Sequence, residues 1–168
     1  REKINSLKRM LETQIIEYSK EINEDVFVFE EKREFVFLCV LNIREGKVIN
    51  KNHIKISMEK SQEDDLFERL ITSYYEKRSI PRNIICDMRY EDKSELIKEW
   101  SKIEKGKEIK MHFPKIHSRR YELLEMGYLN LKEEVEKYLR QKKVVQEGLR
   151  NLKKTLRLNS HPYRIECF

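Results

Sequence analysis

The sequence predicts a mixed α/β fold, with a helix before and a longer helix after a five-stranded sheet. The chain has 168 residues, which suffices for one domain or two small ones. Stretches rich in β-branched and aromatic residues alternate with stretches whose apolar residues recur at helical spacing. Seven Phe, eight Tyr and one Trp, with many Ile and Leu, supply enough apolar surface for a core, which excludes disorder.

The N-terminal part predicts one helix and three strands. Residues 1–22 contain neither Pro nor Gly, and their apolar residues recur at three- and four-residue steps, as on one helical face. Three β-rich stretches follow, within 26–29, 34–44 and 47–57, and charged turns separate them. We expect an antiparallel meander whose almost wholly apolar middle strand is covered on both faces and whose third strand is an edge strand.

The next part predicts two helices around a short strand. The acidic segment 61–64 supplies an N-cap and an acidic first turn for a helix that ends near Arg78. Residues 83–86 form a short strand of buried type, and the helix over residues 93–105 ends at Gly106. Because helical crossovers join parallel strands, we expect the strands that flank these helices to be parallel.

A last strand and a long helix complete the chain. With residues 108–113 as a strand, the order is β-β-β-α-β-α-β, which is the order of an RNase H-like core. The long helix is expected over about residues 118–158, where apolar positions follow a heptad seam with one polar break at Lys142. The seam consists of Leu124, Tyr128, Leu131, Val135, Tyr138, Lys142, Val145, Leu149, Leu152 and Leu156. We expect the N-terminal and C-terminal helices to pack together beside the sheet.

The charge distribution favours an acidic partner. The net charge is +6, but residues 137–157 carry eight basic residues against Glu147 alone. A second basic group surrounds Pro114, near a helix N-terminus that also attracts phosphate. We predict sequence-independent DNA phosphate contacts from both groups, with a merely solvated helix face as the alternative. The predicted residues are Lys110, Lys115, Arg119, Arg120, Lys142, Lys143, Arg150, Lys153, Lys154 and Arg157.

Other features argue against disulfides, metal ligation and a membrane span. The longest apolar run has seven residues, far short of the roughly 20 that a span needs. Three widely spaced cysteines without a CxxC pair predict reduced thiols and a cytoplasmic protein, with Cys39 and Cys86 as core residues. We expect the four histidines to be surface or loop residues without metal-ligand geometry. They are His53, His112, His117 and His161.

Carboxylates raise the possibility of a metal-dependent nuclease. RNase H chemistry places acids on the first strand, the first helix and the end of the fourth strand, around two cations about 4 Å apart. The candidates are Asp25, Asp64, Asp65, Glu68 and Asp87. We prefer structural roles, with Asp25 as a strand-boundary turn residue and Asp87 as a loop carboxylate, because the body of the first strand offers no acid. The chain is therefore expected to be non-catalytic and to bind no metal.

Short motifs along the chain occur in a recognisable order. They are Arg1-Glu-Lys-Ile4 with Leu7, Ile80-Pro-Arg-Asn-Ile-Ile85, Glu99-Trp100, and Pro162-Tyr-Arg-Ile-Glu-Cys-Phe168. In this order they resemble the central region of the UvrC family, the nuclease subunit of the bacterial UvrABC nucleotide excision repair system. The last motif resembles the segment before the first catalytic carboxylate of the family's RNase H endonuclease domain. His117 stands where the family often has glycine.

The resemblance implies a domain organisation. Residues 1–22 would continue the UVR motif, the helical hairpin that binds UvrB, and residues 23–115 would form a non-catalytic RNase H-like core. Residues 116–158 would form the long basic helix, and residues 159–168 would lead into the catalytic RNase H domain. Divalent metal is expected for the nuclease domains outside this sequence and for none of the residues within it.

The resemblance also implies a function and partners. The expected partners are UvrB, damaged double-stranded DNA and the UvrC catalytic domains, in DNA repair and the SOS response. The leading hypothesis is a module that positions the nuclease domains on damaged DNA. The alternatives are a protein-interaction scaffold for UvrB without DNA contact, and a metal-dependent nuclease in its own right.

Overall fold

The computed structural model describes residues 22–32, 34–57, 65–160 and 162. The predicted helix over residues 1–22 and its packing on the long helix fall outside these residues, apart from Ile22, as do segment 61–64 and most of 159–168. The chain divides into two compact units, residues 1–131 and residues 132–168.

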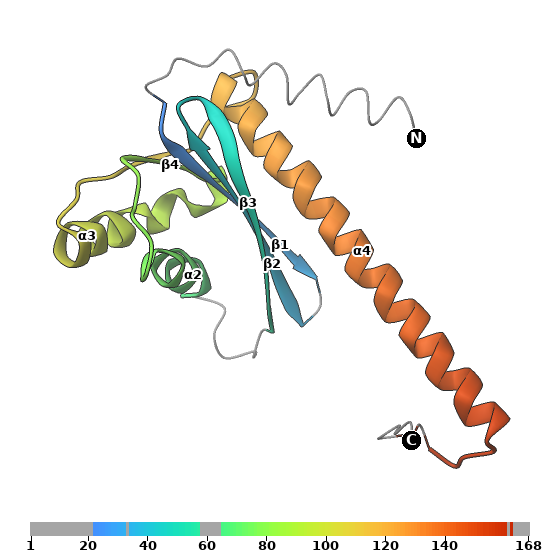
Figure 1. Cartoon of the computed structure of the whole chain (residues 1–168). Helices are drawn as coiled ribbons and strands as arrows, with labels where there is room; N and C mark the ends of the chain where they lie inside the picture. Colours follow the sequence, from blue (N-terminus) through green and yellow to red (C-terminus); the bar gives the residue numbers. More distant parts are fainter. Residues whose placement is uncertain (1–21, 33, 58–64, 161, 163–168) are drawn as a thin grey trace. The chain divides into compact units, whose positions relative to one another are not determined.

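A five-stranded mixed sheet of order β3-β2-β1-β4-β5 forms the centre of the first unit (Figure 1). The strands β1 (Glu24–Lys32), β2 (Phe35–Arg44) and β3 (Lys47–Ser57) are antiparallel neighbours, so the predicted meander with β3 at its edge is confirmed. The short strands β4 (Asn83–Ile85) and β5 (Lys110–His112) continue the sheet in parallel, β4 beside β1 and β5 beside β4. Helical crossovers therefore join parallel strands, as predicted.

Three α-helices and one 3₁₀ helix complete the described fold. They are α2 (Leu66–Tyr75), the 3₁₀ helix η2 (Met88–Lys93), α3 (Ser94–Lys105) and α4 (Arg119–Thr155). The mixed α/β, RNase H-like order is confirmed, and α3 ends at Gly106 in the left-handed conformation (φ 60°), where glycine lacks a Cβ penalty. The helix η2 was not predicted, because its six residues are mostly charged and carry no apolar period.

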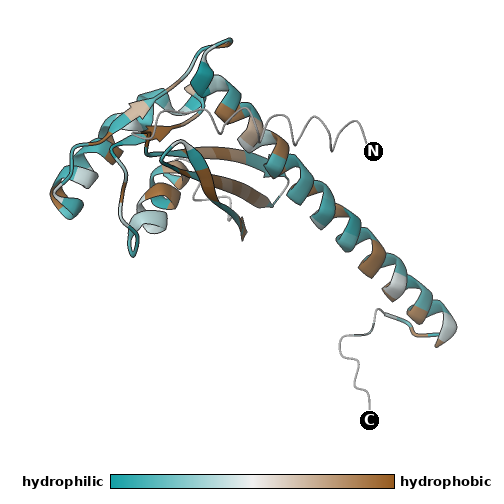
Figure 2. Ribbon diagram, turned by 45° about the horizontal axis from the view of Figure 1, so that its top comes forward, coloured by the Kyte–Doolittle hydropathy of each residue, from teal (hydrophilic) through white to brown (hydrophobic). Residues whose placement is uncertain are grey.

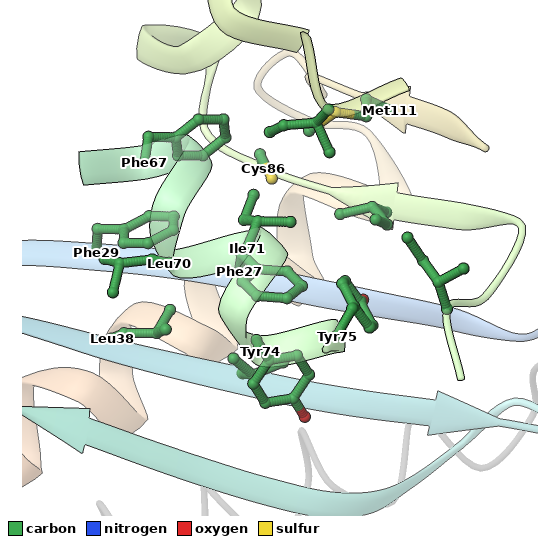
Figure 3. Packing of buried hydrophobic residues seen from close by; sticks show 14 of the residues in the cluster. Phe27, Phe29, Leu38, Phe67, Leu70, Ile71, Tyr74, Tyr75, Cys86 and Met111 are labelled. Atoms are coloured by element: carbon green, nitrogen blue, oxygen red, sulfur yellow. The ribbon is translucent and has the colours of Figure 1, made fainter. Parts of the chain in front are cut away.

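One face of the sheet packs against α2 and α3. Alternate residues of β1 and β2 point to this face, and Figure 3 shows Phe27, Ile71, Tyr74 and Tyr75 gathered between β1 and α2. The Phe27 ring meets the Tyr74 ring edge-on, with centroids 5.3 Å apart. Cys39, on the opposite face, and Cys86 are fully buried as predicted, and burial raises the pKa of the Cys39 thiol to about 12.

The opposite face packs against the first turns of α4, up to Leu131. Leu123, Leu124 and Leu131 are buried there, and Gly127 lies so close to Val28 that a Cβ atom on Gly127 would be 3.0 Å from a Val28 methyl carbon. Because both faces are covered, β2 is buried along almost its whole length, as its apolar sequence predicted.

The second unit continues α4 to Thr155. Figure 2 shows this stretch as largely hydrophilic with isolated hydrophobic positions. Three of the later seam residues, Val145, Leu152 and Leu156, are exposed, and Val145 and Leu156 are each 60% accessible. The helix ends earlier than predicted, because Leu158 N–H donates to the Lys153 carbonyl (3.0 Å) and closes the last turn. Among the described residues, no helix is both long and apolar enough to cross a membrane.

Candidate nucleic-acid interface

A surface cleft of about 730 Å³ lies in the first unit beside the start of α4. It contains three of the ten predicted DNA-contacting residues, Lys115, Arg119 and Arg120. We call it the β5–α4 cleft, and its lining includes Ile22, Glu24, Asn83, Phe113, Lys115 and Arg119. The structure therefore brings three of the four basic residues predicted around Pro114 together at one concave site.

The loop between β5 and α4 is fixed by local hydrogen bonds. The Ser118 hydroxyl donates to the Lys115 carbonyl (2.8 Å) and accepts from the Tyr121 amide (3.3 Å), so Ser118 is the N-cap of α4. His117 has φ 69°, a conformation that glycine adopts more easily, which explains why glycine would suit this position. The first amides of α4 have no intrahelical acceptor, so this end of the helix attracts anions.

Arg120 is engaged inside the cleft. Its Nη2 and Nε atoms donate to Glu24 Oε1 at 2.6 and 3.1 Å, and Glu24 is only 4% exposed. Its Nη1 lies 3.1 Å from His112 Nδ1, and His112 Nε2 lies 2.9 Å from Asn83 Oδ1. The structure thus places Arg120 in an internal ion pair. The expectation that His112 is a surface or loop residue is wrong, since it ends β5 and has polar partners on both ring nitrogens.

These contacts fix the protonation of His112. Because a guanidinium can only donate, Nδ1 must accept from Arg120, and the ring proton lies on Nε2, which donates to Asn83. Burial first, and then the positive charge of Arg120, lower the pKa of His112 below its ordinary value. His112 is therefore neutral in the folded protein at neutral pH.

The lowered pKa predicts an acid-dependent loss of stability. Above the ordinary pKa of histidine, about 6.5, both folded and unfolded chains hold His112 neutral, so stability is complete. Below it the unfolded chain binds a proton that the folded chain does not, so the free energy of unfolding falls as the pH drops from about 7 to 5. Urea denaturation at pH 7.5 and 5.5 should show a smaller pH effect in His112→Gln than in the wild type. His53→Gln is the matched control. A pH effect in His112→Gln as large as the pH effect in the wild type would contradict the prediction.

Lys110 lies outside the β5–α4 cleft. It lines a different hollow, beside α3, together with the carboxylate residues Glu95, Glu99 and Glu108. The same hollow is also lined by Arg82, Lys98 and Lys102. Lys110 therefore lies among acidic and basic side chains, apart from the basic group around Pro114 to which it was predicted to belong.

The second unit carries the remaining predicted residues. At about 100° of rotation per residue, the five basic residues on the helix lie within an arc of about 120° on α4. They are Lys142, Lys143, Arg150, Lys153 and Lys154. An ion pair between Lys143 and Glu147 (3.9 Å) is exposed and weak. Arg157 follows the end of the helix with φ 51°, so it does not belong to this helical face.

The carboxylates predicted as nuclease candidates have structural partners. Asp25 lies within β1 at 1% exposure, where Arg44 Nη1 (2.6 Å) and the Tyr75 hydroxyl (2.7 Å) donate to it. The expectation that Asp25 is a turn residue, and that the first strand offers no acid, is therefore wrong. Acidic residues are rare in strands, so the sequence signal placed the start of β1 too late. The pairing of Glu24 with Ile43 extends β1 to these acids.

Asp87 and Glu68 are also engaged. Asp87 caps η2 by accepting from the Arg89 amide (2.9 Å), and it accepts from the Tyr128 hydroxyl (2.6 Å). Burial opposes its ionisation, but these hydrogen bonds and Arg89 together lower the pKa of Asp87. Glu68 pairs with Lys93 at 3.7 Å. Across the residues that the structure describes, no three His, Cys, Asp or Glu side chains are grouped to hold a metal ion.

The remaining two nuclease candidates are Asp64 and Asp65. Asp65 precedes α2 and is exposed, and its side chain makes no capping hydrogen bond. Asp64 lies outside the described residues. The expectation that the chain is non-catalytic stays a prediction.

Together, the sheet order and its parallel crossovers define an RNase H-like α/β domain, with a cleft that Lys115, Arg119 and Arg120 line at the start of α4. The family model described as "UvrC Ribonuclease H-like domain" matches residues 23–138. The chain belongs to the UvrC family.

Curated relatives agree with this assignment. The chain is 39% identical over 168 residues to UvrABC system protein C of Fusobacterium nucleatum. This match covers 100% of the chain and 28% of that protein. It is 29% identical over 167 residues to UvrABC system protein C of Methanothermobacter thermautotrophicus, covering 99% of the chain and 28% of that protein. The chain therefore spans little more than a quarter of the length of these relatives.

Proposed function

We propose that this chain is the non-catalytic RNase H-like module of the UvrC subunit of the bacterial nucleotide excision repair nuclease. In this proposal it positions the nuclease domains on damaged DNA and contacts the duplex itself. The observation that carries the proposal is the concentration of five basic residues on one face of α4, next to a single acid, Glu147.

Phosphate contacts suit this arrangement. A row of Lys and Arg side chains along a helix neutralises backbone phosphates and releases counterions without reading bases. Incision directed by damage needs no base-specific contact, so a sequence-independent surface is sufficient. The basic β5–α4 cleft adds a second positively charged site in the first unit.

The carboxylates support the non-catalytic part of the proposal. A pair of divalent cations needs several acids free to converge on it. Here Asp25 is held by Arg44 and Tyr75, and Asp87 by Arg89 and Tyr128. Two cationic partners already neutralise the acids that would bind a metal, so the residues present do not fit a metal centre. In this proposal divalent metal belongs to nuclease domains outside this chain.

Salt-dependent duplex binding tests the proposal. We expect the anisotropy of a labelled duplex to report binding by the chain at about 50 mM salt, and about 10²- to 10³-fold weaker binding at about 200 mM if five phosphates are contacted. Absence of binding at the lower salt would overturn the proposal.

A matched pair of variants locates the binding surface. The double variant Lys153→Gln and Lys154→Gln removes two charges from the basic arc and should reduce the salt slope by about 2. The control Lys137→Gln and Arg140→Gln removes two charges from the same helix outside the arc, where both pair with neighbouring glutamates. Equal losses in both double variants would show that only net charge matters and that the arc is not the interface.

A protein-interaction scaffold for UvrB is the second candidate function. Val145 and Leu152 on α4, and Leu156 directly after it, are exposed beside the basic arc. Exposed apolar residues at heptad spacing suit a protein partner. This function would be favoured if duplex binding were absent and purified UvrB bound the wild type but not Leu152→Glu. Magnesium-dependent nicking that Asp87→Asn abolishes would favour the third possibility, a nuclease.

A further inference from the structure

We propose that the β5–α4 cleft binds one unpaired nucleotide, with its phosphate at Lys115, Arg119 and the start of α4 and its base against Phe113. This inference rests on the proposed function only in taking nucleic acid as the ligand. It concerns the first unit alone and uses none of the basic residues of the second unit.

The electrostatics of the cleft favour a phosphate. Among the described residues of the lining, Glu24 is the one acid, and Arg120 neutralises it through two hydrogen bonds to the same carboxylate oxygen. Lys115 and Arg119 both line the cleft, are both exposed, and bring two positive charges to it. The N-terminus of a 37-residue helix, capped by Ser118, adds partial positive charge at the same place.

The apolar part of the lining suits a base. Phe113, Pro114 and Ile22 are all half-buried, so each presents apolar surface to the cleft as well as to the protein. Aromatic and apolar surfaces of this kind stack with nucleobases, whichever base is present. Asn83 Oδ1 accepts a hydrogen bond from His112 Nε2, which leaves the Asn83 amide NH₂ group as a donor for a base carbonyl.

The size of the cleft is sufficient for a nucleotide. A volume of about 730 Å³ lies within the range of about 300–1,000 Å³ typical of small-ligand pockets. Paired bases are enclosed in a stack and cannot enter such a cleft, whereas a nucleotide that is flipped out or belongs to a single strand can. The cleft therefore favours unpaired nucleotides. A helix that contacts only backbone phosphates does not distinguish unpaired from paired nucleotides.

Competition binding tests this proposal. A short labelled oligothymidylate should bind the wild-type chain, and unlabelled thymidine monophosphate should compete at lower concentration than inorganic phosphate does. Lys115→Gln should weaken oligonucleotide binding several-fold. Lys110→Gln removes the same charge five residues earlier but outside the cleft, and it should change binding less than twofold.

The base wall has its own test. Phe113→Leu should weaken oligonucleotide binding by about 5- to 100-fold if a base stacks on the ring. Because Phe113 also packs against the core, Pro114→Ala is the second variant, and thermal unfolding of each confirms that it folds. The proposal is overturned if inorganic phosphate competes as well as thymidine monophosphate does and neither Phe113→Leu nor Pro114→Ala affects binding. The cleft would then be an anion site.

The two proposals fail separately. Oligonucleotide binding that is absent, or is indifferent to Lys115→Gln, overturns the nucleotide site even if the duplex still binds through Lys153 and Lys154. Duplex binding that is absent while the oligonucleotide binds in the cleft overturns the duplex surface on α4 and leaves the nucleotide site supported.

Discussion

Replacing Arg44 with methionine is expected to lower the free energy of unfolding by about 3 kcal/mol. The carboxylate of Asp25 is 1% exposed, and Arg44 is the cation beside it, with Nη1 2.6 Å from Oδ1. Removing the guanidinium leaves a buried negative charge whose remaining hydrogen-bond donor is the Tyr75 hydroxyl. Because the Arg44 side chain is 29% exposed, solvent partly screens the loss, so the expected cost is at the lower end for buried pairs. Urea denaturation at pH 7 measures it.

A second variant and a control separate charge burial from other effects. Adding Asp25→Asn to Arg44→Met removes the uncompensated charge and should recover part of the lost stability. The exposed pair of Lys98 and Glu95 has nearly the same separation, 2.7 Å, yet Lys98→Met should change stability by less than about 0.5 kcal/mol. If Arg44→Met costs no more than Lys98→Met, the buried pair does not stabilise the fold.

Replacing Gly127 with leucine is expected to cost about 3 kcal/mol. A Cβ atom at Gly127 would lie 3.0 and 3.1 Å from the two methyl carbons of Val28, which is itself fully buried in β1. The larger side chain would force α4 away from the sheet or Val28 out of its rotamer, and overpacking of this kind typically costs 1–3 kcal/mol. The shift in thermal unfolding midpoint reports it.

Gly148 in the same helix is the control. A Cβ atom there has nothing within 4 Å, so Gly148→Leu should favour the helix by up to about 1 kcal/mol. The two leucine substitutions should therefore change stability in opposite directions. Destabilisation by both would mean that helix geometry, and not contact with Val28, sets the need for glycine at position 127.

Periodicity predicted most of the secondary structure. The alternation in β3, the apolar run of β2, the glycine that ends α3 and the heptad spacing of α4 are all local signals, and each element formed where its signal lies. These signals depend only on neighbouring residues, so one sequence suffices to recognise them. The order of elements then fixed the parallel crossovers.

The polar contacts of the site could not be predicted in the same way. Arg120 and Glu24 are 96 positions apart, and Tyr75 and Asp25 are 50 apart, so no local pattern relates them. The cluster of basic residues predicted that Arg120 contacts phosphate. Clustering in the sequence does not indicate which basic side chain pairs with a buried acid. From the sequence alone, an acid at the start of a strand is assigned to a turn, because the distant residue that pairs with it is not known.

The order of the strands has a consequence for how this domain folds. The meander forms from neighbouring hairpins, and the two-residue turn at Glu45 and Gly46, with φ 50° and 72°, matches the right-handed twist of its strands. The pairing of β1 with β4, by contrast, joins Val26 to Ile85 and closes a loop of about 60 residues, which carries a larger entropic cost. We infer that the meander assembles early and that β4 and β5 dock last. Substitutions in these two strands should then act mainly by speeding unfolding, while substitutions in the meander slow folding.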